Sequence, residues 1–219
     1  MSYILLLDTS ADSSVVAISK NGVIISQQTN SELRNHASAI NQMIDEAAKE
    51  AGILLSELKA VAVCSGPGSY TGVRIAMSTA KGICYALGIP LMAHDRLYLM
   101  SLKERNEEKR VLGSVLTARP GEFFVSLYNE NFDTIVPPTH LFEADLAKVF
   151  DSSLFLHITT DAEKSTFNQL KVNFLSFSSN ITLNYNTWAA YAFTQFELQQ
   201  FCNIGTVSPL YIKDVYIHK

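Results

Sequence analysis

The chain has 219 residues, of which 47% are hydrophobic and 17% are charged, and its formal net charge is −4. This composition is typical of a compact folded protein with one large domain or two small ones. The acidic balance argues against a nucleic-acid-binding surface, because proteins neutralise phosphates with lysine and arginine. No segment has the pattern of a secretory signal or a membrane span, so the sequence predicts a cytoplasmic protein.

The first thirty residues predict three antiparallel strands. Residues 3–7 and 14–19 are short apolar runs separated by a polar turn, which is the pattern of a hairpin. Asn21-Gly22 is the strongest short turn signal in the chain, and it returns residues 23–28 as a third strand.

Residues 32–51 predict a long helix. Ser31 or Asn30 can cap its start, and Gly52 ends it. One face carries an apolar stripe that we expect to pack on the sheet or on another helix: Leu33, Ala37, Ile40, Ile44, Ala47 and Ala51. A narrower seam beside it could pack on a partner: His36, Ala39, Met43 and Glu46.

Residues 60–88 predict the centre of the protein, with a buried strand at 60–64, a glycine turn and an unusually apolar helix. Ser69 or Thr71 can cap this helix, and Gly88 ends it. One face is apolar at helical spacing: Val73, Ala76, Met77, Ala80, Ile83, Cys84 and Leu87. The other side is also mostly small or apolar. Such a helix is covered either wholly by its own domain or by its domain and a partner.

The glycine turn before this helix allows two interpretations. Its spacing, GxGxxxG, is neither the dinucleotide fingerprint nor a Walker loop. Because N–H groups at a helix start attract anions, the turn could hold a phosphate weakly; equally, the glycines could serve only a tight turn, and the acidic turn before them could only satisfy backbone donors. The residues of this weak anion or nucleotide site would be Asp8, Ser10, Gly66, Gly68, Ser69, Thr71 and Gly72.

The rest of the chain predicts a smaller second set of elements. In chain order we expect a strand at 91–93, a charged helix at 97–109, hairpin strands at 111–118 and 122–128, a loop at 129–138 with at most one short strand, a helix at 143–150, a strand at 154–158, a helix at 162–170, a strand at 172–177 and a helix at 186–201. The charged run at 103–110 indicates a domain boundary, so the predicted domains are 1–107 and 108–219, the latter with the last helix and tail.

The cysteines and histidines predict no metal site. Cys64, Cys84 and Cys202 lie in apolar segments without a CxxC spacing, which is typical of reduced core thiols. A lone histidine on a helix, such as His36, usually packs or forms a hydrogen bond instead of binding a metal.

Three segments resemble the TsaB (YeaZ) family: YILLLDTS at 3–10, CSGPGSYTGVRIAMSTAKG at 64–82 and PLYIKD at 209–214. The resemblance is near verbatim over 65–82 and clear in outline over 1–105. It implies an α/β, two-lobe actin-like (Hsp70-like) ATPase fold, with mixed sheets flanked by helices and a reduced second lobe. It also implies a non-catalytic accessory role in making the threonylcarbamoyladenosine modification of tRNA.

The same resemblance implies partners. These would be a catalytic TsaD-type paralogue in a heterodimer, a TsaE-like ATPase in a larger complex, and tRNA only through that complex. We expect a homodimer when the chain is alone, no tightly bound cofactor apart from ATP or ADP at the complex interface, and no membrane. The partner-facing residues would be His36, Ala39, Ile40, Met43, Ile75, Ser78, Thr79, Gly82 and Ala86.

Two features favour the accessory role over an enzyme. An actin-like ATPase uses glycine-rich phosphate and adenosine loops, but no two of the ten glycines here are adjacent. The metal-binding histidine pair of the catalytic paralogue falls on Arg96 and Met100, which are not ligands a metal would select. Two alternatives stay open: a weak nucleotide hydrolase that uses Asp8 and the loop at 66–72, and a homodimeric RNA-binding module.

Overall fold

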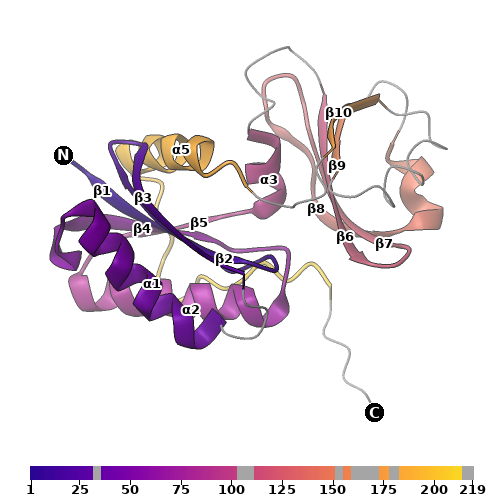
Figure 1. Cartoon of the computed structure of the whole chain (residues 1–219). Helices are drawn as coiled ribbons and strands as arrows, with labels where there is room; N and C mark the ends of the chain where they lie inside the picture. The colour runs from indigo at the N-terminus through magenta and orange to yellow at the C-terminus, as the bar shows by residue number, and fades with distance from the viewer. Residues whose placement is uncertain (32–35, 103–110, 151–154, 159–172, 178–182, 214–219) are drawn as a thin grey trace. The chain divides into compact units, whose positions relative to one another are not determined.

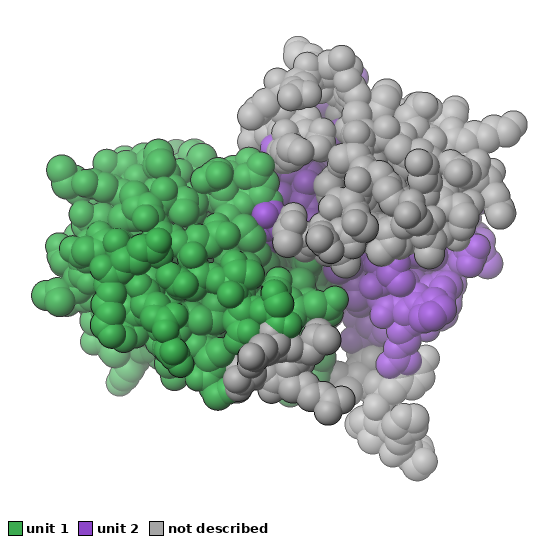
Figure 2. Space-filling view, in the orientation of Figure 1, with its two compact units in different colours: residues 1–96, 184–210 green, residues 97–183, 211–219 purple. Residues whose placement is uncertain are grey.

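The computed structural model describes residues 1–31, 36–102, 111–150, 155–158, 173–177 and 183–213 (Figure 1). Their contacts divide the chain into two units, coloured separately in Figure 2: unit 1 is residues 1–96 with 184–210, and unit 2 is residues 97–183 with 211–219. None of the described helices combines the length and the apolarity that crossing a membrane requires.

Unit 1 is a five-stranded sheet with helices on both faces (Figure 1). Its elements are β1 (Tyr3–Asp8), β2 (Ser14–Lys20), β3 (Val23–Asn30), α1 (His36–Ala51), η1 (Leu55–Glu57), β4 (Leu58–Cys64), α2 (Tyr70–Leu87), β5 (Leu91–His94) and α5 (Tyr185–Glu197). The strand order is β3-β2-β1-β4-β5, with the first three antiparallel and β1, β4 and β5 parallel. The predicted start of the fold, three antiparallel strands followed by a helix and a parallel strand, is confirmed.

The main core of unit 1 lies between this sheet and the pair of helices α1 and α2. It is built from alternate strand residues and one stripe of each helix: Leu5, Leu7, Val16, Ile18, Ile40, Ile44, Val61, Val63, Ala76 and Met77. Strands β1 and β4 are buried on both faces because α5 covers the opposite side of the sheet (Figure 1). Their continuous apolar runs reflect this double burial.

Helix α5 corrects the predicted domain division. The sequence predicts this helix as part of the second domain, 108–219, but it packs on β1, β3 and β5 of the first sheet. The indole Nε1 of Trp188 donates a hydrogen bond to Nδ1 of His94, 2.8 Å away, and the ring of Tyr191 lies 5.0 Å from the same imidazole. A histidine at the end of β5 therefore anchors a helix that follows it by almost one hundred residues.

Unit 2 contains a second sheet with the same arrangement. Its elements are β6 (Leu112–Arg119), β7 (Glu122–Tyr128), β8 (Thr134–Phe142), η3 (Glu143–Lys148), β9 (Phe155–Ile158) and β10 (Asn173–Phe177), and α3 (Arg96–Ser101) leads into them. The order is β10-β9-β6-β7-β8. In both sheets the first strand in sequence is central, with an antiparallel pair on one side and a parallel pair on the other.

Several second-half predictions need correction. The segment predicted as a loop at 129–138 contains the start of the nine-residue strand β8, and its prolines, Pro137 and Pro138, are tolerated because β8 is an edge strand. The helix predicted at 143–150 is the 3-10 helix η3. The strands predicted at 154–158 and 172–177 are confirmed as β9 and β10. The predicted helix at 162–170 and residues 103–109 of the charged helix lie outside the described residues.

The start of α2 packs against the turn that follows β1, backbone against backbone. A Cβ atom on Gly68 would clash with the carbonyl oxygen of Ser10, and one on Gly72 would clash with the carbonyl oxygen of Thr9. Ser69 caps the helix by accepting the N–H of Gly72, and its own N–H bonds to the carbonyl oxygen of Ser10 at 2.8 Å. Two of the motif glycines are therefore required for this close approach.

Replacing Gly72 with alanine should destabilise the protein, because the added methyl group forces two backbone segments apart. We expect a loss of about 2 kcal/mol in the free energy of unfolding, within the usual range for overpacking. Gly82→Ala in the same helix is the matched control, since nothing lies within 4 Å of its Cβ position. That variant should gain roughly 0.5–1 kcal/mol from helix propensity. Urea unfolding measures both, and equal stability of the two variants would contradict the packing described.

The pair of His94 and Trp188 predicts a pH dependence of stability. Burial lowers the pKa of His94 to about 4 from its ordinary value near 6.5, so the folded protein holds this imidazole neutral. As pH falls from 6.5 towards 4, the His94 imidazole binds a proton in the unfolded state but stays neutral in the folded state. The free energy of unfolding should therefore fall by about 3 kcal/mol over that window from this group.

The test compares urea unfolding of the wild type and His94→Gln between pH 7.5 and about 4.5, a range set by these two pKa values. The variant is expected to be less stable at neutral pH, because glutamine fills the imidazole site imperfectly, but to lose less stability on acidification. Parallel pH curves for the two proteins would show that His94 does not titrate as described.

Candidate functional site

A buried polar network, which we call the Asp8 cluster, lies at the end of β1. Its members are Asp8, Ser10, Cys64, Arg96 and Tyr185. One carboxylate oxygen of Asp8 accepts the backbone N–H of Ser10 at 2.9 Å and its hydroxyl at 2.5 Å. The other carboxylate oxygen accepts the hydroxyl of Tyr185 at 3.0 Å. Because Asp8 is only 1% exposed, these donors replace the water that an ionised carboxylate would otherwise need.

Arg96 supplies the positive charge of the Asp8 cluster. This fully buried guanidinium donates from Nη1 to the hydroxyl oxygen of Ser10 at 2.7 Å, and its backbone N–H bonds to the carbonyl oxygen of Gly66 at 2.7 Å. The Ser10 hydroxyl therefore lies between the two charged groups: it donates to the carboxylate of Asp8 and accepts from the guanidinium of Arg96. A buried pair of charges needs such hydrogen bonds to offset the cost of desolvation.

The remaining members of the cluster stay protonated. Burial, and then the nearby charge of Asp8, raises the pKa of the Cys64 thiol and the pKa of the Tyr185 hydroxyl well above their ordinary values. A buried thiol of this kind is a poor nucleophile, because the thiolate is the reactive form. Tyr185 instead serves as a hydrogen-bond donor that ties α5 to the end of β1.

The residues predicted to form the anion site do not share one surface. Asp8, Ser10, Gly66 and Gly72 are buried, whereas Gly68, Ser69 and Thr71 are exposed. The N–H groups of Ser69, Gly72 and Val73 all bond to protein oxygens. Of the two interpretations that the sequence allowed, the geometry favours the one in which the glycines and Asp8 build a tight turn.

Arg96 and Tyr185 were not predicted as site residues. The resemblance to the catalytic paralogue identifies Arg96 only as a position where a metal ligand is missing, and Tyr185 lies one residue before the predicted start of its helix. No spacing in the chain connects them with Asp8, because 88 and 177 positions separate them from it. In the part of the chain that the structure describes, no group of three or more His, Cys, Asp or Glu side chains could hold a metal ion.

The outer face of α2 is the second feature of unit 1. Val73, Ala76, Met77, Ala80 and Cys84 point into the core, as their spacing predicted. The opposite face is exposed: Arg74, Ser78, Gly82, Tyr85 and Ala86. Tyr85 is 84% exposed. The described residues therefore cover this helix on one side only.

The predicted seam on α1 is only partly accessible. Ile40 is 1% exposed and Met43 is buried as well, so both belong to the core and not to an outer surface. The prediction that these two residues face a partner is therefore wrong. They are buried because the seam lies next to the stripe of α1 that packs on the sheet. Ala39 is half-buried. His36 begins α1, but its side chain lies outside the described residues.

Of the predicted partner residues on α2, Ser78, Gly82 and Ala86 are exposed. Ile75 and Thr79 are half-buried beside them, and Ile75 packs against the core. The structure thus brings together the α2 half of the predicted surface and removes the two largest apolar side chains from the α1 half.

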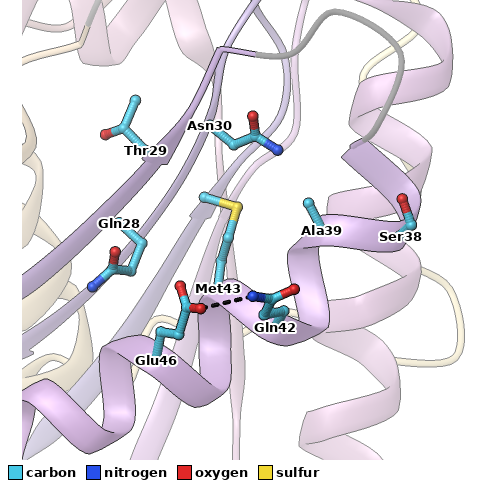
Figure 3. Close-up of a pocket in the computed structure, with 8 residues that line it drawn as sticks. All are labelled: Gln28, Thr29, Asn30, Ser38, Ala39, Gln42, Met43 and Glu46. Carbon is cyan, nitrogen blue, oxygen red and sulfur yellow. Dashed lines mark hydrogen bonds between the residues drawn. The ribbon is translucent and has the colours of Figure 1, made fainter.

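A polar hollow of about 400 Å³ lies between the end of β3 and the first turns of α1 (Figure 3). It is lined by Gln28, Thr29, Asn30, Ser38, Ala39, Gln42, Met43 and Glu46. Nε2 of Gln42 donates to Glu46 at 2.8 Å, and Nε2 of Gln28 donates to Glu50 at the same distance. Among the described residues that line it, Glu46 is the one carboxylate and none has a basic side chain.

Unit 2 has its own charged cluster, centred on Glu122 at the start of β7. The ammonium of Lys213 and Nε2 of His140 both contact the same oxygen of Glu122, His140 at 2.8 Å. The hydrogen bond from Lys213, and then that from His140, holds the pKa of Glu122 below its ordinary value. Lys213 of the C-terminal motif therefore has a partner within its own unit.

Comparison with known proteins agrees with this fold. The family described as "TsaD: tRNA N6-adenosine threonylcarbamoyltransferase" matches residues 23–208. The tRNA threonylcarbamoyladenosine biosynthesis protein TsaB of Bacillus subtilis is 27% identical over 145 residues, 65% of this chain and 63% of that protein. The TsaB protein of Buchnera aphidicola is 33% identical over 129 residues, 58% of this chain and 61% of that protein. The matched part thus spans about three fifths of these curated relatives.

The solved structure of YeaZ from Pseudomonas aeruginosa superposes with a TM-score of 0.77 over 96% of this chain and 100% of that chain, at 23% identity. At this identity the superposition supports the fold alone, whereas the family match spans most of the sequence. The chain therefore belongs to the tRNA N6-adenosine threonylcarbamoyltransferase (TsaD) family, among its TsaB (YeaZ) proteins, and has the actin-like ATPase fold.

Proposed function

We propose that this chain is a non-catalytic subunit in the synthesis of N6-threonylcarbamoyladenosine in tRNA, and that it forms a heterodimer with a TsaD-type transferase. Membership of the family and the names of its TsaB relatives support the pathway. The observation that carries the proposal is the exposed outer face of α2, which lies within the segment most similar to TsaB.

The outer face of α2 has the properties of a helix-packing surface. Ser78, Gly82 and Ala86 are small, exposed and spaced by four residues, so they form one line along the helix. Small side chains let two helix axes approach to about 8 Å. Tyr85 stands beside this line as an exposed aromatic side chain, which is the residue type enriched at interface hot spots.

The Asp8 cluster supports the non-catalytic part of the proposal. In an actin-like ATPase, an aspartate of the first turn acts on metal-bound phosphate. Asp8 is buried and accepts three hydrogen bonds from protein donors, and Arg96 neutralises it through Ser10. Using Asp8 for phosphate would require these bonds to break.

The proposal includes the further partners that the resemblance implies. These are a TsaE-like ATPase in a larger complex, tRNA bound only through that complex, and ATP or ADP at the interface between subunits. The chain would work in the cytoplasm. Without its partner, the exposed face of α2 would pair with a second copy, because an apolar and small-residue face gains free energy when it leaves water.

Gly82→Arg should weaken association with the TsaD-type subunit. An arginine in the line of small residues holds the two helices apart. Such overpacking costs about 1–3 kcal/mol of binding free energy, which reduces the affinity roughly tenfold or more. Folding should be unaffected, because the Cβ position of Gly82 faces open space. Co-expression followed by sedimentation of the complex measures the loss.

Thr194→Arg is the matched control, because Thr194 is exposed on α5, on the opposite face of the same sheet (Figure 1). This variant should bind the partner as the wild type does. Equal binding by Gly82→Arg, with an unchanged melting curve, would place the partner elsewhere.

Isothermal titration calorimetry of the isolated chain with MgATP tests the proposal that the chain is non-catalytic. We expect binding in the millimolar range or weaker and negligible turnover, because the buried, hydrogen-bonded Asp8 is not available to a phosphate. Micromolar binding with measurable hydrolysis would favour the alternative, a weak nucleotide hydrolase. The Gly82→Arg variant should behave identically in this assay.

A further inference from the structure

Four residues of α2 have the spacing that receives a side chain of a facing helix. When two helices pack, a side chain of one inserts among four residues of the other, at positions i, i+3, i+4 and i+7. Ser78, Lys81, Gly82 and Tyr85 have this spacing, and we call them the Gly82 quartet.

Gly82 leaves room within the quartet for an inserted side chain. Nothing lies within 4 Å of the position that a Cβ atom would occupy on this residue. Ser78 is exposed and Tyr85 is 84% exposed, so both belong to the outer face of α2. Lys81 is half-buried, and its flexible four-carbon stem allows the ammonium to reach a group that packs over Gly82.

The quartet offers hydrogen-bond donors and one positive charge. Ser78 and Tyr85 each carry a hydroxyl, and Lys81 carries an ammonium with three N–H donors. Helix α2 contains no aspartate or glutamate, so no carboxylate one turn away on the same helix compensates the charge of Lys81. An ionised carboxylate matches this set, because it only accepts hydrogen bonds and carries the opposite charge.

A carboxylate of a packed helix suits the quartet better than a phosphate of a nucleic acid does. The line of small residues that contains Ser78 and Gly82 allows another helix to approach closely. A nucleic acid would need several cations to replace its counterions, and the chain has a net charge of −4. Beside a packed helix, the ring of Tyr85 would also exclude water, which strengthens an ion pair.

We infer that a glutamate or aspartate of the partner subunit inserts into the Gly82 quartet and forms an ion pair with Lys81. This inference rests on the proposed heterodimer and adds the chemistry of its contact. Small residues alone would admit many helices, whereas a cation beside them disfavours a helix that places a basic or apolar residue at this point. Lys81 is therefore a specificity-determining residue of the outer face of α2.

The test measures the affinity of the full chain for the TsaD-type subunit, by sedimentation, at about 0.05 M and about 0.5 M salt. Lys81→Glu should weaken binding at low salt at least roughly tenfold, because it brings two negative charges together. Added salt should weaken binding of the wild type, since it screens an attraction, and should strengthen binding of Lys81→Glu, since it screens a repulsion. A purely structural role of Lys81 would not reverse the salt dependence.

Lys148→Glu is the matched control. It makes the same charge change at an exposed lysine of η3, in unit 2, where Lys148 forms only a surface ion pair with Asp145. This variant should bind the TsaD-type subunit with the affinity and the salt dependence of the wild type. Its melting curve and that of Lys81→Glu should match the wild type, which shows that both variants fold.

A charge exchange identifies the partner residue. Each exposed aspartate and glutamate of the TsaD-type subunit is replaced in turn with lysine, and each variant is combined with Lys81→Glu. One of these exchanges should restore most of the lost affinity, while the same partner variant should bind the wild-type chain poorly. Such a double-mutant cycle reports direct contact between the two residues.

The outcomes separate this inference from the heterodimer itself. If the wild type forms no complex, or if Gly82→Arg binds normally, the proposed heterodimer fails and the inference fails with it. If Gly82→Arg weakens binding but Lys81→Glu binds as the wild type does, or if no charge exchange restores binding, the heterodimer stands and the ion pair is refuted. Binding of tRNA by the isolated chain that depends on Lys81 would also overturn the inference, because a phosphate would then be the occupant.

Discussion

The contact between the glycine turn and the turn after β1 is the constraint on which unit 1 depends. Gly68 and Gly72 bring the start of α2 against the carbonyl oxygens of Ser10 and Thr9, and any side chain would prevent it. The hydroxyl of Thr9 then donates to the carbonyl oxygen of Gly72 at 2.5 Å. This approach fixes where α2 begins, and hence which of its faces meets the sheet and which remains outside.

The Asp8 cluster connects that contact to the rest of unit 1. Asp8 and Ser10 come from the end of β1, Cys64 from the end of β4, Arg96 from the segment after β5 and Tyr185 from α5. Burying a carboxylate and a guanidinium is costly unless hydrogen bonds satisfy both, and removing one partner would leave the other charge without compensation. The Asp8 cluster is a hydrogen-bonded network that links four separate segments of unit 1. This structural use of Asp8 supports the proposed role of a subunit that assists catalysis by another chain.

Unit 1 thus buries the polar Asp8 cluster and leaves the outer face of α2 exposed. The face of α2 is a line of small side chains with one aromatic neighbour, which suits the packing of another helix.

The sequence by itself determined the local elements and the family. Periodic apolar residues predicted β1, β4 and the inner face of α2, and Ser69 and Gly88 marked the ends of that helix, because these signals act between neighbouring residues. Only the tertiary structure decided that α5 belongs to unit 1, that Arg96 and Tyr185 meet Asp8, and that Met43 is a core residue. These outcomes depend on contacts between segments far apart in the chain, and on small rotations of a helix about its axis. The spacing of residues within one segment contains neither kind of information.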